Sequence, residues 1–409
     1  MDGVFTAEAL KGFKCYGKHQ WLPVDDEECS NQPRVLQRGA SNLYFPVMES
    51  SISIPPWSDN LQEALGIYWD TIINTDEKDR SVFIGILARG DLSTVIQEFG
   101  ISADELSKRI EERLLLYRND SILDIRPEEF RQFNSPTNIS SENDREFETR
   151  ISEIPDSLFE YFSKIVRVVR LREVQSIRGF TRISPPSDSG DSRICRLSAS
   201  HKTWLPGIEI RGEGIFLAFN RKKLSLWEKK EEIQARAQEI DDVWMKEWRS
   251  RNGDKPRSKE ITPRFLLLHT FSHSLMRQLT LDCGYSGASL RERLYVSKEE
   301  PEMAGILIYT ATSDSDGTLG GLQRQGESNR IQRSIMAAIQ AMEWCSSDPL
   351  CIQGANSVPE RLSKAACHAC VLAPETSCEE FNRFLDRAML IGLEDKPESG
   401  FFSGLEKMY

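Results

Sequence analysis

Residues 345–378 read CSSDPLCIQGANSVPERLSKAACHACVLAPETSC and hold five of the nine cysteines in the chain. The inner pair, Cys367 and Cys370, forms a C-x-x-C, a spacing that lets one tight turn direct two thiolates at one ion. Zinc in a structural site takes four ligands in a tetrahedron, at about 2.3 Å for sulfur. The prolines and the glycine of this stretch indicate loop structure, which has little core of its own. The stretch therefore predicts a structural zinc clip.

The stretch offers one cysteine more than a tetrahedral site needs. Competing interpretations are a redox C-x-x-C pair or cysteines scattered in the core. A redox pair usually follows a strand in a βαβ unit, and no such strand is obvious before this pair. Cys345 follows the helical run that ends at Trp344, so it could be a core residue instead. We expect Zn²⁺ as the cofactor, with these ligands: Cys351, Cys367, Cys370 and Cys378, and Cys345 as a substitute.

The length, composition and charge of the chain limit the classes of protein to which it can belong. A chain of 409 residues is long for one core, so two or three sub-domains are expected. Its 39% hydrophobic and 28% charged residues are typical of a soluble protein, and no apolar run approaches the roughly 20 residues that span a membrane. We expect no membrane partner. No targeting segment is recognisable at the start, which favours the cytoplasm and reduced thiols.

The net charge of −11 argues against a protein that binds nucleic acid unaided. Any contact with DNA would use a local basic patch or a more basic partner. The expected fold class is α+β, with mixed helices and short sheets and the C-terminal zinc clip. The expected regions are 1–57 (a cysteine and aromatic N-terminal segment), 58–154 (helices and a polar linker), 155–260 (a mixed region) and 261–409 (a zinc-binding domain).

Residues 155–182 are the most basic stretch of the chain. Its first part predicts a helix, because apolar residues recur at helical spacing at Leu158, Phe162, Ile165 and Val169. The basic side chains are either a solvated helix face or a strip that contacts phosphates. We name them the basic strip: Lys164, Arg167, Arg170, Arg172, Arg178 and Arg182.

The region after residue 261 opens with a predicted buried helix that carries His269 and His273. These histidines are four residues apart and share one face. An acidic, glycine-rich loop with Asp314 and Asp316 follows a predicted strand. The four side chains could bind a second metal and cleave phosphodiesters, although core histidines and an ordinary turn are the simpler interpretation. The sequence has no Walker A, G-x-S-x-G or H-E-x-x-H motif.

Several long strings carry a family resemblance. They are RVLQRGASNLYFPV, SISIPPWSD, WLPGIEIRGEGIFL, LLHTFSHSLMRQL, DGTLGGL and AACHACVLAPETSCEEFNRFLDRAML. Together they resemble DrmB, the helicase-partner subunit of the bacterial DISARM anti-phage system. The part from about residue 261 to about residue 392 also resembles the zinc-binding domain that accompanies many superfamily-two helicases. It is similar, too, to the helicase-linked domain of the Mrf DNA-repair proteins.

The resemblance implies a chain that partners a separate DrmA-like helicase and helps it bind DNA during phage restriction. It implies that the ATPase, the methyltransferase and any nuclease are other subunits, so that this chain is an accessory protein and not an enzyme. The cysteine cluster of the family falls on the cysteines chosen above. Its H-x-x-S/A-H helix falls on His269 and His273.

The N-terminal cysteines differ from the family pattern. DrmB-like proteins carry a further N-terminal region with more cysteines before the QRGASN-type string. Cys15 and Cys29 therefore resemble a half-site, and plain core cysteines are the alternative. We expect a lost or separately encoded segment to have supplied the other ligands, which makes a separate protein an expected partner. Two tightly bound zinc ions in the isolated chain would contradict this expectation.

Overall fold

A computed structural model gives the arrangement of the chain. It describes residues 43–54, 65–99, 125–135, 138–139, 146–182, 184–187, 191, 193–257, 259–299, 302–310, 321–354, 362–393 and 395–405, with parts of 102–110 and six positions before residue 23.

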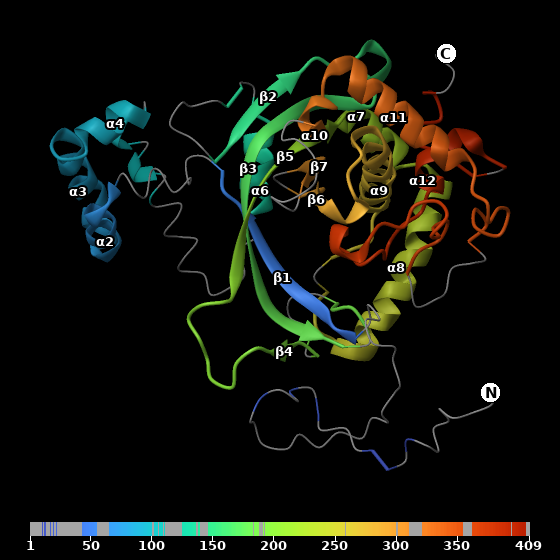
Figure 1. The fold of residues 1–409 in the computed structure, drawn as a ribbon, viewed down its shortest axis with the longest axis horizontal. Helices are drawn as coiled ribbons and strands as arrows, with labels where there is room; N and C mark the ends of the chain where they lie inside the picture. Colours follow the sequence, from blue (N-terminus) through green and yellow to red (C-terminus); the bar gives the residue numbers. More distant parts are fainter. Residues whose placement is uncertain are drawn as a thin grey trace.

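A curled, seven-stranded antiparallel sheet forms the framework (Figure 1). Its longest strand, β3 (Phe162–Thr181), lies in the interior of the sheet. Along one side β3 pairs with β1 (Phe45–Ile52) and β2 (Glu148–Ser152), and along the other with β5 (Gly207–Phe219) and β4 (Cys195–Arg196). Beyond β5, the order continues through β7 (Met303–Thr310) to β6 (Leu290–Ser297).

Both faces of the sheet are buried around β5. Ile215, Leu217 and Phe219 belong to the larger core, which lies under the helices. Phe216 and Ala218 belong to a second core, which α6 (Arg126–Phe133) covers. Because strand side chains alternate between faces, a strand buried on both faces is apolar throughout. This explains the continuous apolar runs of β5 and β7.

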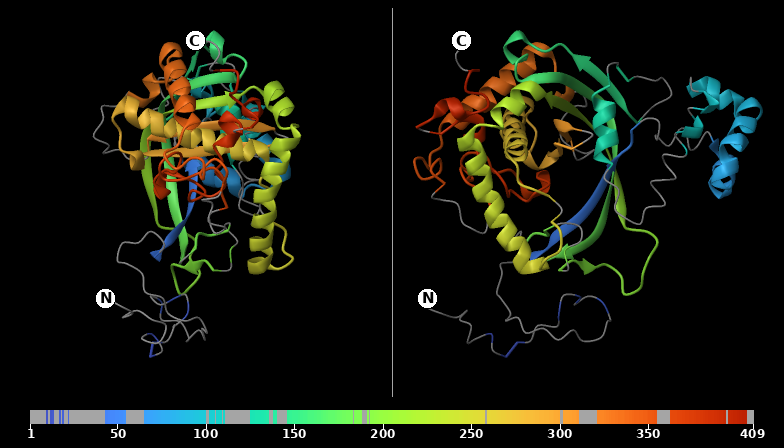
Figure 2. Two further views of the ribbon diagram at one scale, coloured as in Figure 1. Left: turned by 90° about the vertical axis from the view of Figure 1, so that its right-hand side faces the viewer. Right: turned by 180° about the vertical axis from the view of Figure 1, so that it is seen from behind.

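The helices of the larger core follow β5 in the chain, and Figure 2 shows them gathered on one side of the curled sheet. The helix α9 (Pro263–Cys283) is buried on all sides between Phe265 and Met276. Thr262 caps it by accepting the Phe265 N–H, and Gly284 ends it in the left-handed conformation at φ 73°. These helices are α7 (Arg221–Trp227), α8 (Glu231–Asn252), α9 (Pro263–Cys283), α10 (Gly321–Arg324), α11 (Ser328–Glu343) and α12 (Ala388–Ile391).

Three helices near the N-terminus pack on one another around a third core that includes Ile72 and Ile84. They are α2 (Ile67–Asn74), α3 (Glu77–Arg89) and α4 (Ser93–Phe99). The α+β class is confirmed by this mixture of helices and one antiparallel sheet. None of the helices in the described residues has the length and apolar character needed to cross a membrane.

The helix predicted from residue 158 to residue 169 is wrong. Residues 156–158 form one short 3₁₀ turn, and the basic strip then begins on β3. Ile165 faces the larger core, whereas Val166 and Val168 face the second. The β-branched residues of this segment suit a strand that is buried on two faces. Hydrogen-bonded pairing with β5 holds the segment in the extended conformation.

Two other segments differ from the prediction. The expected polar linker contains α6 and β2, because the phenyl groups of Phe130 and Phe133 complete the second core. The predicted helix after Cys378 is reduced to the single turn α12. Moreover, β5, from the expected region 155–260, pairs with β7 from the expected region 261–409, so these two regions share one sheet.

Candidate metal centre

Four cysteine sulfurs converge beside the C-terminal end of α11. Their Sγ atoms lie 3.4 Å apart for Cys345 and Cys367, 3.6 Å for Cys367 and Cys370, and 3.8 Å for Cys351 and Cys370. All four Sγ atoms lie within 4.8 Å of one another. Sulfurs at about 2.3 Å from one zinc ion form a tetrahedron with edges of about 3.8 Å, so the donor set fits zinc.

The local chain explains how each sulfur reaches the cluster. Cys345 leaves the end of α11, and a compact turn brings Cys351 back beside it, closed by the Cys351 N–H donating to the Ser347 carbonyl at 3.0 Å. The C-x-x-C forms its own turn, in which the Cys370 N–H donates to the Cys367 carbonyl at 3.1 Å. The Cys367 N–H also lies 3.2 Å from the Cys370 sulfur, which suits a thiolate.

A partly buried ion pair holds the first turn in place. The Asp348 carboxylate accepts the Cys345 N–H at 2.8 Å and the Ile352 N–H at 3.0 Å. The fully buried Arg387 forms an ion pair with Asp348 and donates to the Met342 carbonyl at 2.6 Å. Four thiolates around Zn²⁺ carry a net charge of −2, and the Arg387 guanidinium offsets part of it.

The thiols of the cluster differ in acidity without a metal. Burial raises the pKa of Cys351 to about 12 and raises the pKa of Cys370 well above its ordinary value. Burial also opposes ionisation of Cys367, but hydrogen bonds from Cys345 and from backbone N–H groups outweigh it and lower its pKa to about 7. Zinc binding therefore has to displace protons from at least the Cys351 and Cys370 sulfurs.

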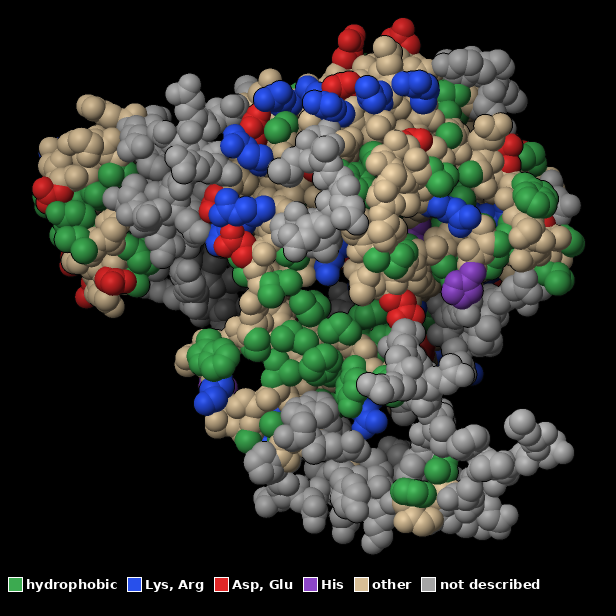
Figure 3. Space-filling model, in the orientation of Figure 1, with side chains coloured by type: hydrophobic (Ala, Val, Ile, Leu, Met, Phe, Trp, Pro, Cys, Tyr) green, Lys and Arg blue, Asp and Glu red, His purple; other side chains and the backbone are tan. Residues whose placement is uncertain are grey.

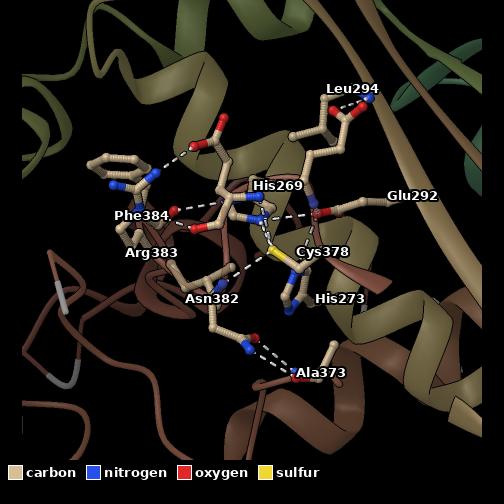
Figure 4. Close-up of polar contacts among 12 residues, drawn as sticks. His269, His273, Glu292, Leu294, Ala373, Cys378, Asn382, Arg383 and Phe384 are labelled. Carbon is tan, nitrogen blue, oxygen red and sulfur yellow. Dashed lines mark hydrogen bonds and ion pairs between the residues drawn. The ribbon is translucent and has the colours of Figure 1, made fainter. Parts of the chain in front are cut away.

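The structure changes one member of the predicted ligand set. It places Cys345, the substitute, in the four-cysteine cluster with Cys351, Cys367 and Cys370. Cys378 lies instead beside His269, with its Sγ atom 3.2 Å from His269 Nε2 (Figure 4). Spacing alone could not separate the two, because both cysteines lie within easy chain reach of the C-x-x-C.

The two histidines share one face of α9, as predicted, and both are buried. Their carboxylate neighbour is Glu292 on β6, whose Oε1 lies 3.2 Å from His269 Nε2 and 3.4 Å from His273 Nε2. Asp314 and Asp316 lie outside the described residues. The sequence analysis did not single out Glu292. This glutamate lies between two arginines in a strand, and that pattern matches no metal-binding motif.

The basic strip lies along β3, and carboxylates of the chain face most of it. Arg170 pairs with Glu148 at 2.7 Å, and Arg172 pairs with Glu209 at 3.0 Å. Arg167 pairs with Glu327, and Arg178 with Glu49, while Lys164 donates to the Asn134 carbonyl and Arg182 lies over the Tyr44 ring. The strip is thus largely neutralised within the chain.

The face seen in Figure 3 has Lys and Arg side chains along its upper edge, with Asp and Glu among them. This edge corresponds to the region of β2, β3 and α11 in Figure 1. Arg170 and Arg178 keep about half and over a third of their side-chain surface exposed, at 48% and 38%. Arg172 keeps only 15%. Cys15 and Cys29, the predicted half-site, lie outside the described residues.

Two comparisons with known proteins bear on this centre. The family described as the MrfA Zn-binding domain matches residues 271–371. The DISARM protein DrmB of Bacillus paralicheniformis is 33% identical over 424 residues, which cover 99% of this chain and 72% of that protein. The chain belongs to the DrmB family.

Within this DrmB-family chain, the matched zinc-binding stretch contains all four cysteines of the cluster. It ends at Val371, before Cys378. The family match and the converging sulfurs together support a structural zinc ion in the C-terminal part. The resemblance drawn from the sequence strings is thereby confirmed.

Proposed function

We propose that this chain is a non-catalytic partner of a separate ATP-dependent DNA helicase in DISARM-type defence against phage. The observation that carries the proposal is the similarity to the DISARM protein DrmB along 99% of the chain. The match to the MrfA Zn-binding domain agrees with the resemblance to the Mrf proteins, which implies a domain linked to a helicase. The sequence has no Walker A motif, and in this proposal the motor and its ATP site belong to another subunit.

The experiment is a DNA-binding titration of the helicase from the same defence system, with and without this chain. We expect the complex to bind DNA more tightly than the helicase alone, and the isolated chain neither to hydrolyse ATP nor to cut DNA. Metal-dependent cleavage by the isolated chain, lost in His269→Ala, would instead support a nuclease. Equal affinity with and without the chain would support a scaffold that does not touch DNA.

The basic strip is the proposed DNA contact, and Arg170 and Arg178 are its best test because their side chains are the more exposed ones. The double variant Arg170→Glu and Arg178→Glu should weaken DNA binding by the complex. Each lost phosphate contact should also flatten the dependence of log affinity on log salt by about 0.9. The measurement is fluorescence anisotropy of labelled DNA across a salt series.

A matched control is Arg221→Glu, which changes a 51% exposed arginine on α7, outside the strip. It should leave both the affinity and the salt slope unchanged. The internal ion pairs of the strip favour the scaffold alternative, because a paired arginine has less charge to offer a phosphate. Unchanged affinity of the double variant at low salt would remove the strip from the interface.

A further inference from the structure

A second set of donor atoms, all within 4.8 Å of one another, converges in the core at α9, apart from the four-cysteine cluster. The Nε2 atom of His269 lies 3.2 Å from Cys378 Sγ and 3.2 Å from Glu292 Oε1. The Nε2 atom of His273 lies 3.4 Å from the same Glu292 oxygen. Donors at about 2.0–2.3 Å from one zinc ion lie about 3.3–3.8 Å apart, close to the spacing found here.

The outer hydrogen bonds orient the two imidazoles toward this centre. His269 Nδ1 lies 3.2 Å from the Phe384 carbonyl, and His273 Nδ1 lies 2.9 Å from the Val371 carbonyl. A carbonyl only accepts, so each Nδ1 carries the proton and donates it. In the neutral ring, Nε2 then holds the lone pair. His269 Nε2 faces Cys378 and Glu292, and His273 Nε2 faces Glu292 (Figure 4). Metal-bound histidines are held in this way by their outer partners.

The Cys378 sulfur is held in a similar manner. The N–H groups of Glu380 and Asn382 point at it from 3.3 Å and 3.2 Å. The chain takes left-handed backbone angles at Asn382 and Phe384, both at φ 60°, and so brings these N–H groups and the Phe384 carbonyl to the centre. Backbone strain of this kind is kept where the surrounding structure requires it.

Two polar atoms of the centre lack a hydrogen bond. Among the described residues, His273 Nε2 and Glu292 Oε2 are buried without a hydrogen-bond partner. The four side chains are at most 6% exposed. Without a metal, two imidazolium groups against one carboxylate would bury a net positive charge. A neutral His273 would keep a buried Nε2 lone pair without a hydrogen-bond donor. Zn²⁺ with a carboxylate, a thiolate and two neutral imidazoles has no net charge.

We infer that a second zinc ion binds here, as a closed structural site, with these ligands: His269 Nε2, His273 Nε2, Glu292 Oε1 and Cys378 Sγ. A set of two nitrogens, one oxygen and one sulfur suits zinc. Four protein ligands fill its tetrahedron, so no position stays open for a water nucleophile. The histidine pair then serves to join α9, β6 and the loop after Cys378, and it is not a nuclease centre.

The second site also supports the first. His273 donates to Val371, next to Cys370, and Arg277 on α9 donates to the Cys370 carbonyl at 2.9 Å. The loop that carries the C-x-x-C is therefore attached to the helix that carries the histidines. Loss of the second ion should loosen this loop.

The test is the zinc content of the purified full-length chain, measured by mass spectrometry after dialysis against zinc-free buffer. We expect two zinc ions per wild-type chain and one in Glu292→Gln or Cys378→Ser. The double variant Cys15→Ser and Cys29→Ser should keep two, which assigns the second ion to the core and not to the N-terminal half-site. Two ions held by the core clusters then leave the half-site incomplete, so the zinc count contradicts the expected missing segment only if this double variant loses an ion. Cys283→Ser, outside both clusters, is the control for a lost thiol.

Cobalt replacement keeps the test decisive if a variant fails to fold. The wild-type chain loaded with Co²⁺ should bind two ions. Its thiolate-to-cobalt absorption should correspond to five sulfur ligands. Its visible spectrum should be the sum of the spectra of one site with four sulfur ligands and one site with mixed ligands. A single zinc or cobalt ion in the wild-type chain would overturn the inference. So would a second ion that persists in both Glu292→Gln and Cys378→Ser. None of these outcomes depends on the proposed helicase partnership.

Discussion

Cys345 and Cys378 stand at opposite ends of the same cysteine-rich stretch, and the folded chain separates their roles. Cys345 completes the four-cysteine cluster because α11 ends beside the C-x-x-C. Cys378 faces His269 because the next residues bend through left-handed angles. Five cysteines are therefore divided four to one between two centres.

At the scale of a residue, Cys370→Ser should destabilise the C-terminal part strongly. Cys370 is a buried member of the zinc cluster, and zinc binding supplies folding free energy to the part of the core around it. We expect a loss of several kcal/mol in the free energy of unfolding and the loss of one zinc ion. Chemical denaturation together with metal analysis measures both.

Cys195→Ser is the matched control, because Cys195 is equally buried but lies outside both clusters. It should keep its zinc and cost only about 1 kcal/mol. A Cys370→Ser protein as stable as Cys195→Ser would show that the cluster does not hold zinc.

At the scale of an element, a buried charge network joins α6 to the sheet. The Glu129 carboxylate of α6 accepts two hydrogen bonds from Arg293 on β6, at 2.6 Å and 2.8 Å. It also accepts the Tyr295 hydroxyl at 3.0 Å and the Ile52 N–H at 3.1 Å. Segments that lie 164 residues apart in the chain are thus held together.

Glu129→Gln should be strongly destabilising, because it leaves the buried Arg293 guanidinium without its counter-charge. Breaking one partner of a buried ion pair costs about 3–5 kcal/mol. The neighbouring Glu128→Gln is the control, since Glu128 forms a pair with the 64% exposed Arg131. It should change the free energy of unfolding by less than about 0.5 kcal/mol. Similar values for the two variants in urea denaturation would contradict the assigned role.

At the scale of the whole molecule, a single sheet joins the strand β1 to the strands β6 and β7, which follow α9 in the chain. The larger core includes Cys345, Cys351 and Cys370 together with helices α7 to α11. The zinc cluster is therefore part of the main core and not an appendage. Events at the metal should affect the thermal stability of the main body of the chain.

Acid should release this zinc. Without metal, burial raises the pKa of Cys351 to about 12, so protons hold that sulfur firmly and zinc must displace them. Zinc-dependent stability is thus present at higher pH and is lost as pH falls, because protons then compete for the sulfurs. Between about pH 8 and about pH 5 we expect zinc release to a chromogenic chelator and a lower unfolding temperature. A chain already stripped of zinc should lack this zinc-dependent step, and a flat response in the zinc-loaded chain would contradict the linkage.

The sequence by itself determined the features that depend on local pattern and composition. The number and spacing of the cysteines predicted zinc, since a C-x-x-C turn is a local structure. The buried helix predicted after residue 261 corresponds to α9, and the strand predicted before Asp314 corresponds to β7. The long sequence strings indicated the family, because matching residues between two sequences requires no three-dimensional information.

Only the tertiary structure decided which groups meet. β3 is a strand because its long-range pairing with β1 and β5 outweighs the helical spacing of its apolar residues. The free energy of that pairing depends on the partner strands, so the sequence of one segment does not reveal it. Cys345 rather than Cys378 joins the cluster because of where α11 ends. Glu292 reaches the histidines because β6 packs against α9. Each of these contacts joins residues far apart in the chain, and their distance is set by the packing of the whole core.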